Sequence, residues 1–270
     1  MRFTGQVAIV TGSSRGIGRA TAVEFGKEGA SVVVNYESNE AAANEVVKEI
    51  KSYGSKAIAV KANMGEMKDR QALVDAAVKE FGRIDVLVNN AGLHYVYPTM
   101  DSVTEDGFDR TLKVNLGGNF FMSQLVAPYM IKQGKGAIVL TSTSSIFYAP
   151  PESPQYFASK GGIETLTRSL AVMLAPQIRV NCVTPGCIDT DMFKHHSPES
   201  KKFLASQTPL LRLGRAEEVA KVSVFLCSED ASFVTGATLR IDGGRTIGPG
   251  KAGGFDALVK SIKPGEEKYK

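Results

Sequence analysis

The stretch Thr11-Gly12-Ser13-Ser14-Arg15-Gly16-Ile17-Gly18 decides the fold of this chain. It follows an apolar run at 7–10 and opens an amphipathic segment, so it is expected to join a buried strand to a helix. Its glycines let the backbone turn tightly and approach a pyrophosphate, and the helix N-terminus offers free N–H groups to an anion. The spacing TGxxxGxG differs from GxGxxG, but its strand–turn–helix context predicts a dinucleotide site. The expected contacts are Gly12, Ser14, Arg15, Gly16, Ile17 and Gly18.

Short apolar runs alternate with helical patterns along the rest of the chain. The runs expected as buried parallel strands are 7–10, 31–35, 57–60, 86–89, 137–140, 178–183 and 238–241. The amphipathic stretches are 19–28, 40–53, 68–81, 108–133 and 155–174. This alternation predicts an α/β, Rossmann-type doubly wound fold, with a seven-stranded parallel sheet and helices on both faces. We expect one catalytic domain over residues 1–245, followed by a tail, 246–270, that is either an inter-subunit arm or a loosely ordered end.

Composition narrows the class of protein. The 270 residues are 43% hydrophobic and 22% charged, which suits one globular domain with a sizeable core. The formal charge of +4 is spread along the chain and predicts no nucleic-acid partner. No apolar stretch reaches the roughly 18 residues of a membrane span, so we expect no membrane association and a cytoplasmic location. Among three cysteines without a CxxC, Cys182 is expected in the core and Cys187 beside the substrate.

Tyr156 and Lys160 are the strongest candidates for catalysis. They stand four residues apart, so on a helix their side chains share one face. An ammonium beside a phenol favours the phenolate, which would bring the exchange of the Tyr156 proton closer to neutral pH. The pair is a common pattern on exposed helices, but here it follows the glycine turn, Asn89-Asn90-Ala91-Gly92 and a Thr/Ser cluster. The combination predicts a redox enzyme.

The end of the second expected strand bears on cofactor choice. In an NAD-specific site an acidic residue there binds the ribose 2′-hydroxyl, but this chain has Asn35-Tyr36, with Glu37 next. Arg15 in the glycine turn is expected to reach a 2′-phosphate, with a charge-assisted bond of roughly 1.5–3 kcal/mol. We therefore expect NADP(H) to be preferred and NAD(H) to remain usable. The alternative is that Arg15 is only a surface residue.

These segments, with four more, resemble the short-chain dehydrogenase/reductase family in its standard-length form. Beyond the glycine turn, the Asn-Asn-Ala-Gly run and Tyr156/Lys160, the likeness is carried by Asn115, by Pro185-Gly186 with Ile188, Thr190 and Asp191-Met192, and by Val234-Thr235-Gly236 and Asp242-Gly243-Gly244. It extends from about residue 5 to 245 in the family's order. The resemblance implies further cofactor contacts at Asn35, Tyr36, Asn63, Met64, Asn90, Ala91, Gly92, Tyr156, Lys160, Pro185, Gly186, Ile188 and Thr190.

The resemblance also implies a reaction and a set of roles. Hydride would pass between the nicotinamide and a carbonyl or carbinol carbon, with Tyr156 as acid or base and Lys160 binding the ribose hydroxyls. Asn115 would fix a water behind Lys160, or would be only a satisfied helix kink. Thr143 stands 13 residues before Tyr156, in the place of the family's usual serine, and a slip of one residue would bring in Ser144. Asn63 stands where the family often has the aspartate that holds the adenine.

The substrate remains open at this level. The expected pocket walls, 93–97, 146–151, 187–192 and 193–213, would suit a hydrophobic ketone, a sugar or an acyl thioester. The leading interpretation is a carbonyl reductase or alcohol dehydrogenase; a 3-oxoacyl thioester reductase, a sugar dehydrogenase using NAD(P), and a non-catalytic nucleotide-binding protein are the alternatives. His195-His196 has no metal-ligand spacing, and no metal is expected. The expected partners are a small carbonyl or alcohol substrate and copies of the same chain, in a homotetramer or homodimer.

Overall fold

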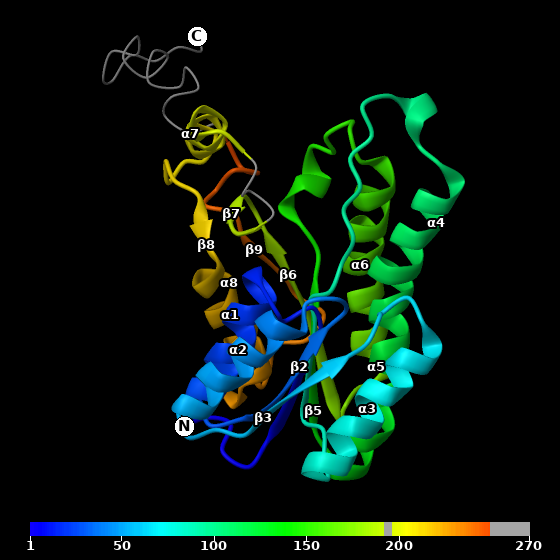
Figure 1. The fold of residues 1–270 in the computed structure, drawn as a ribbon, viewed down its shortest axis with the longest axis vertical. Coiled ribbons are helices and arrows are strands. Elements are labelled where there is room, and N and C mark those ends of the chain that lie inside the picture. The colour runs from blue at the N-terminus through cyan, green and yellow to red at the C-terminus, as the bar shows by residue number, and fades with distance from the viewer. Residues whose placement is uncertain (192–195, 249–270) are drawn as a thin grey trace, which may run out of the picture.

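A parallel sheet of seven strands forms the centre of the computed structural model, which describes residues 1–191 and 196–248 (Figure 1). The strands are β1 (Val7–Val10), β2 (Ser31–Tyr36), β3 (Ala57–Lys61), β4 (Val86–Asn89), β5 (Gly136–Thr141), β6 (Ile178–Pro185) and β9 (Thr238–Ile241). Their order is β3-β2-β1-β4-β5-β6-β9, and every neighbouring pair is parallel. The order reverses between β1 and β4, so the ligand crevice of such a sheet is expected beyond the carboxyl ends of these two strands.

Helices cover both faces of the sheet, as the alternation of elements predicted. One face carries α1 (Gly16–Lys27), α2 (Glu40–Ser52) and α8 (Ala216–Cys227); the other carries α3 (Met67–Phe81), α5 (Gly118–Gln133) and α6 (Pro154–Met173) (Figure 1). Successive residues of β1 supply both cores, because Ala8 and Val10 pack under α1 whereas Ile9 packs under α3 and α5. Burial on both faces explains why the strands read as continuous apolar runs.

The predicted helix at 108–133 is divided in the structure. It begins as α4 (Glu105–Leu112), passes through a π-helical turn, η2 (Lys113–Gly117), and continues as α5. Gly118 faces the Met64 carbonyl, which would lie 3.0 Å from a Cβ at that position, so the helix packs closely against the chain that follows β3. The π turn brings Asn115 into the interior, where it is fully buried.

Several elements lie outside the segments predicted from the sequence. They are α7 (Pro198–Ser206), α8, the short strand pair β7 (Ile188–Asp189) and β8 (Gly214–Arg215), and the 3₁₀ turns η1 (Met100–Ser102), η3 (Ser144–Phe147) and η5 (Glu229–Ala231). The turn η3 follows β5, and β7 and α7 follow β6. These three elements build the walls above the sheet. Met192, His195 and the tail from 249 to 270 lie outside the described residues.

Candidate active site

The glycine turn lies against the end of β4. Gly12 and Gly16 have φ of +61° and +55°, a region that favours glycine. A Cβ on Gly12 would stand 2.8 Å from the Ala91 Cα, so only glycine fits this contact. No side chain caps the first turn of α1, and its N–H groups are left to bind an anion.

Asn90 and Thr11 tie the turn to the sheet. The Asn90 amide donates to the carbonyls of Thr11 and Gly12, both at 3.1 Å, and the Thr11 hydroxyl accepts from the N–H groups of Asn90 and Ala91 at 2.9 and 3.0 Å. Gly18 completes the contact, because a Cβ there would stand 2.5 Å from the Asn90 amide nitrogen. These residues hold the turn in the shape that a pyrophosphate requires.

The structure corrects the expectation for Asn35. Its side chain is 2% exposed, its Oδ1 accepts from Gly12 N at 2.8 Å, and its amide donates to the Ala62 carbonyl at 3.0 Å. Asn35 therefore points into the protein and braces the glycine turn against β3, instead of facing a ribose. Tyr36, in the core beside it, is the last residue of β2, and Glu37 follows with its side chain exposed.

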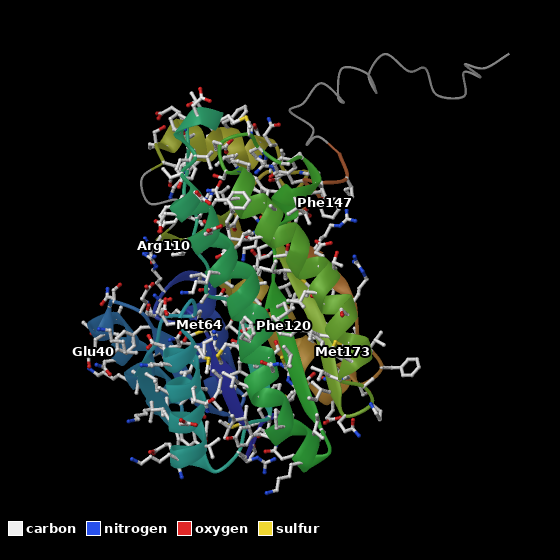
Figure 2. All side chains as sticks on the ribbon, turned by 90° about the vertical axis from the view of Figure 1, so that its right-hand side faces the viewer. Glu40, Met64, Arg110, Phe120, Phe147 and Met173 are labelled. Carbon is white, nitrogen blue, oxygen red and sulfur yellow. The ribbon has the colours of Figure 1, made fainter. Side chains whose placement is uncertain are left out.

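Asn63 and Met64 differ in whether their side chains remain available to a ligand. Asn63 uses its Oδ1 to accept from Gly65 N at 2.8 Å, and its amide nitrogen keeps no partner among the described residues, so it is left for an adenine. The side chain of Met64 packs in the core beneath α5, and its carbonyl accepts from Arg70 (Figure 2). The side chain of Met64 therefore closes the core, and the expected cofactor contact at Met64 stays a prediction.

Lys160 and Asn115 converge on Gly92. A Cβ at Gly92 would stand 3.2 Å from Asn115 Oδ1 and 3.5 Å from Lys160 Nζ. Asn115 Oδ1 accepts from Leu93 N at 2.7 Å and its amide donates to the Ser159 hydroxyl at 3.0 Å, while its own carbonyl accepts from Asn119. Through these bonds Asn115 positions the chain that follows β4 and the helix α6. They fit the alternative expectation, a helix kink whose polar groups are all hydrogen-bonded.

Tyr156 stands on α6 one turn before Lys160. The Lys160 Nζ lies 5.6 Å from the centroid of the phenol ring and donates to the Thr141 carbonyl at 2.8 Å. The His94 imidazole also packs against the phenol, with ring centroids 4.3 Å apart and planes at 36°. His94 is held by Ser153, whose Oγ lies 2.9 Å from its Nε2. The sequence placed His94 only in a pocket wall, and no motif marks its contact with Tyr156.

Desolvation governs the ionisation of this pair. It raises the pKa of Tyr156 to about 12 and lowers the pKa of Lys160 to about 8. The lowered phenol pKa expected from the YxxxK spacing is therefore not found, because loss of water outweighs the cation 5.6 Å from the ring. The phenol is protonated at neutral pH. Desolvation also lowers the pKa of His94; Glu152 opposes this and Lys160 adds to it.

Three hydroxyls follow β5, and their surroundings differ. Ser142 donates to the Lys160 carbonyl at 2.8 Å and is buried. Thr143 is half-buried; its Oγ1 accepts from Ser145 N at 3.3 Å and lies 3.5 Å from the Pro185 carbonyl. Ser144 is fully buried, and its hydroxyl has no partner among the described residues. The half-buried Thr143 is therefore the hydroxyl of the three that a substrate can reach.

The loop after β6 closes the site from the other side. Gly186 packs on Asp242, whose Cα would stand 2.7 Å from a Cβ there. Ile188 is buried in the core, and Thr190 reaches the glycine turn, 3.6 Å from the Cβ position of Gly16. The loop thus brings Thr190 to the glycine turn, while Gly186 holds it against the end of β9 and Ile188 anchors it in the core.

A dinucleotide fits this arrangement. The uncapped N-terminus of α1 and the positive-φ glycines follow β1, and the open Asn63 amide follows β3. The Lys160 ammonium is carried by α6, the helix after β5. Among residues 1–191 and 196–248, His, Cys, Asp and Glu form no cluster of three that could hold a metal ion.

Comparison with known proteins agrees with this geometry. Residues 12–246 match a family model described as Enoyl-(Acyl carrier protein) reductase. The chain is 40% identical over 250 residues to Glucose 1-dehydrogenase 2 of Bacillus subtilis, covering 92% of this chain and 97% of that protein. It belongs to the short-chain dehydrogenase/reductase family.

Two further relatives are equally similar. The 3-oxoacyl-(acyl-carrier-protein) reductase of Thermotoga maritima is 40% identical over 252 residues, covering 92% of this chain and 100% of its own. The L-rhamnose 1-dehydrogenase (NAD(P)(+)) of a Sphingomonas species is 40% identical over 247 residues, covering 90% and 97%. The short-chain dehydrogenase/reductase studied here is accordingly an NAD(P)-dependent oxidoreductase that acts on CH–OH groups and the corresponding carbonyls. Within the described part of the chain, no helix has the length and apolar character needed to cross a bilayer.

Proposed function

We propose that this protein is an NADP(H)-dependent carbonyl reductase, or an alcohol dehydrogenase in the reverse direction, with Tyr156 as acid and base. The observation that carries this proposal is the environment of the Tyr156 phenol on α6. The phenol has Lys160 and His94 as neighbours and is protonated at neutral pH. When bound, the nicotinamide supplies hydride exchange with carbon. Tyr156 then gives its proton to the oxygen that becomes the alcohol.

Lys160 and Asn115 support this step. We assign the Lys160 ammonium to the ribose hydroxyls, and Gly92 leaves room for that approach because it has no Cβ beside Nζ. The same charge stabilises the phenolate that Tyr156 leaves behind. Asn115 acts as a positioning residue, since it bonds both to Leu93 and to Ser159 on the catalytic helix.

Thr143 is our assignment for the hydroxyl that holds the substrate oxygen. Its side chain is half-buried at the start of η3, which packs against the helix that carries Tyr156. Its Oγ1 also lies 3.5 Å from the carbonyl of Pro185, so the hydroxyl stands at the border of η3 and the loop after β6. Ser144 is the alternative, favoured by one observation, its buried hydroxyl without a described partner.

The preference for NADP(H) rests on Arg15. Its side chain is exposed at the N-terminus of α1 and makes no hydrogen bond or ion pair within the described chain. Asn35 no longer supports the preference, because it is committed to the glycine turn. The exposed Glu37 after β2 favours NAD(H), since its carboxylate would repel a 2′-phosphate. Cofactor choice is therefore a competition between these two charges.

The substrate class is a carbonyl compound or secondary alcohol. The relatives' names support two narrower alternatives, a sugar dehydrogenase and a 3-oxoacyl thioester reductase. The walls contain aromatic residues at Tyr95, Tyr97, Phe147 and Tyr148, which suit sugar rings and apolar ketones alike.

We also propose a cytoplasmic homotetramer or homodimer that pairs through α5 and α6. These helices expose large apolar side chains, among them Phe121, Ile131 and Val172. Met173 is another and is labelled in Figure 2. Residues 1–245 would form the catalytic domain and residues 246–270 an inter-subunit arm. A monomer at micromolar concentration in analytical ultracentrifugation would contradict the assembly.

A substrate panel tests the reaction. Aldehydes, ketones, sugars and 3-oxoacyl thioesters are mixed with NADPH, and the corresponding alcohols with NADP⁺, while the absorbance of the reduced nicotinamide is followed. Turnover of simple ketones is expected. Turnover confined to thioesters or to sugars would select an alternative, and binding of NADPH without any turnover would indicate a non-catalytic protein.

A further inference from the structure

Arg245 contacts two of the expected walls of the substrate pocket, at Cys187 and at Tyr148. It follows Gly244 in the turn after β9, and its guanidinium contacts the Cys187 sulfur and stands 5.0 Å over the ring of Tyr148. Asp242 stiffens this turn, because its carboxylate accepts from Gly244 N at 2.9 Å and from Thr246 N at 3.0 Å. The position of Arg245 is therefore set by a bonded turn.

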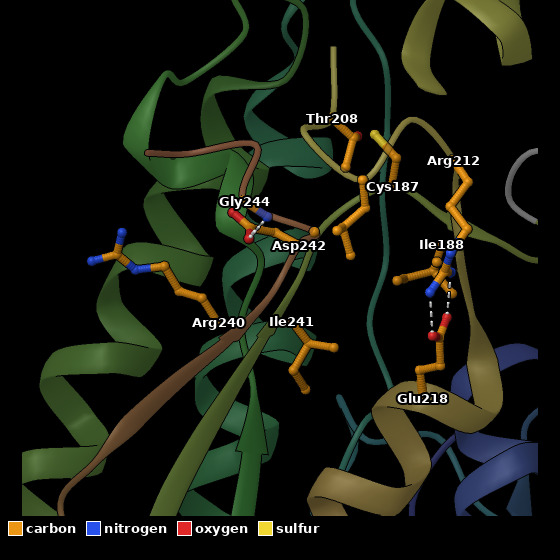
Figure 3. Close-up of a pocket in the computed structure, with 12 residues that line it drawn as sticks. Cys187, Ile188, Thr208, Arg212, Glu218, Arg240, Ile241, Asp242 and Gly244 are labelled. Atoms are coloured by element: carbon orange, nitrogen blue, oxygen red, sulfur yellow. Dashed lines mark hydrogen bonds and ion pairs between the residues drawn. The ribbon is translucent and has the colours of Figure 1, made fainter. Parts of the chain in front are cut away.

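The charge of Arg245 has no anion beside it. Desolvation raises the pKa of Cys187, against the opposing effect of Arg245, and desolvation also raises the pKa of Tyr148. Both neighbours are thus neutral at physiological pH. Among residues 1–191 and 196–248 no carboxylate pairs with Arg245. Arg212, on the far side of a cavity of about 200 Å³ bordered by Cys187, is by contrast bound to Glu218 at 2.6 and 2.8 Å (Figure 3).

Both contacts of Arg245 lead back to the expected reaction centre. Tyr148 Oη lies 3.0 Å from the Ser145 hydroxyl, and Ser145 N donates to Thr143 at 3.3 Å. Cys187 is two residues beyond Pro185, whose carbonyl lies 3.5 Å from the Thr143 hydroxyl. Two short chains of neighbouring residues, one through Tyr148 and one through Cys187, therefore connect the Arg245 guanidinium to Thr143. Thr143 is the residue assigned to the substrate oxygen.

We propose that Arg245 binds a carboxylate of the substrate, so that the substrate is an oxo acid, or the hydroxy acid in the reverse direction. This inference rests on the proposed carbonyl reduction at Tyr156. A planar guanidinium binds a carboxylate through two parallel hydrogen bonds, and the Tyr148 ring holds that plane in place. A charge-assisted contact of this kind favours the acid over a neutral isostere by about tenfold to a hundredfold.

Calorimetry on the complex with NADP⁺ tests the inference without requiring turnover. The probes are 4-oxopentanoate and 5-oxohexanoate, each against its primary amide, which has the same shape without the charge. In the unmodified protein the acids should bind at least about tenfold more tightly than the amides. Arg245→Met should remove that preference while leaving amide binding, NADP⁺ binding and the melting temperature unchanged.

Arg240→Met is the matched control. Arg240 also lies over an aromatic residue of the same wall, 4.3 Å from the Phe147 ring, and borders the cavity, but its guanidinium extends away from the other labelled lining residues (Figure 3). The control should keep the preference for the acids. Equal binding of acids and amides in the unmodified protein overturns the inference, and so does a preference that survives Arg245→Met. Equal loss of both probes in Arg245→Met would assign the residue to holding Tyr148, which also overturns it.

Two further readings separate the possible failures. Inorganic phosphate that binds in an Arg245-dependent way, when neither oxo acid does, would overturn the carboxylate assignment. Reduction of neutral ketones is measured in parallel. If neutral ketones are reduced but the acid preference is absent, only the inference about Arg245 fails. If no ketone is reduced, the proposed function fails, and calorimetry still decides whether Arg245 binds a carboxylate.

Discussion

The glycine turn and the substrate walls lie at the same edge of one sheet but treat their polar groups in opposite ways. At the turn, Asn35, Asn90 and Thr11 direct their side chains to backbone partners of the protein. In the walls, the buried hydroxyl of Ser144 and the buried Oε1 of Gln155 have no described partner. The glycine turn is therefore braced by bonds within the protein before any ligand arrives, whereas buried polar atoms beside the substrate keep hydrogen-bonding capacity unused.

Backbone strain follows the same division. Positive φ is carried by glycine in the turn, at Gly12 and Gly16, where it costs little. Among the described residues, positive φ outside glycine occurs only at Ala149 and Leu211, both in the walls. Such conformations cost on the order of 1–3 kcal/mol each and cluster at ligand sites.

The largest effect is expected from Tyr156→Phe, a change in the substrate half. Tyr156→Phe keeps the ring that stacks on His94 but removes the proposed proton donor, so kcat should fall by about 10²–10⁴-fold. NADPH affinity, measured by fluorescence titration, should be unchanged. Near-normal turnover in this variant would end the proposed mechanism.

Thr143→Ala and Ser144→Ala sharpen the comparison within one wall. Loss of the hydroxyl that holds the substrate oxygen should lower kcat by about 10²–10³-fold in Thr143→Ala. Ser144→Ala should be nearly neutral for turnover and should raise the melting temperature, because it removes a buried hydroxyl without a described partner. The reverse ranking in steady-state kinetics would show that the register is slipped by one residue.

Gly12→Ala breaks the nucleotide half. A Cβ would press on Ala91 and shift the turn, which should lower kcat/KM for NADPH by about 10²-fold. Gly54→Ala is the control, since Gly54 has φ of +84° with no neighbour within 4 Å of its Cβ position. It should lose stability from φ strain without losing NADPH affinity. Equal losses in both variants would mean that strain, not contact, fixes the turn.

Arg15→Ala tests the exposed positive charge in the glycine turn. It should raise the KM for NADPH by about tenfold and leave the KM for NADH little changed. Glu37→Gln should act in the opposite direction, lowering the KM for NADPH by a smaller factor. The assignment of NADP(H) is wrong if the unmodified protein prefers NADH, or if Arg15→Ala weakens both cofactors equally.

The smallest effect concerns pH. Because the pKa of Lys160 is lowered to about 8, its charge is present below that pH and lost above it. Carbonyl reduction, which needs protonated Tyr156 and charged Lys160, should be flat below about pH 8 and fall severalfold above it. Alcohol oxidation should instead rise toward alkaline pH, since it needs the phenolate. Initial rates in both directions over one buffer series will show whether the profiles diverge.

The sequence predicted the nucleotide half far better than the substrate half, for a physical reason. A turn such as residues 11–18 is defined by glycines at short spacing, and the strands around it are long apolar runs, so both leave a local signal. Asn35 was misplaced because an amide at a strand end looks the same whether it faces a ribose or the backbone of Gly12.

The walls depend on contacts between distant segments. His94 and Tyr156 are 62 positions apart in the sequence, and Arg245 and Cys187 are 58 apart, so no spacing rule connects either pair. The π-helical turn at Asn115 was likewise read as part of one long helix, because its apolar pattern continues through it. Desolvation of Tyr156 and Lys160 could not be inferred from the sequence, since it depends on everything packed around them.

The packing of α1 on α8 has a consequence for the order in which the chain acquires structure. It joins residues 16–27 to residues 216–227, about 200 positions later, and α1 buries Phe25 in the core that α8 completes. During synthesis, the helix that opens the nucleotide site must therefore wait for one of the last elements to emerge before its apolar face is covered. The first residues of the nucleotide site to be synthesised are therefore among the last to gain a covered apolar face.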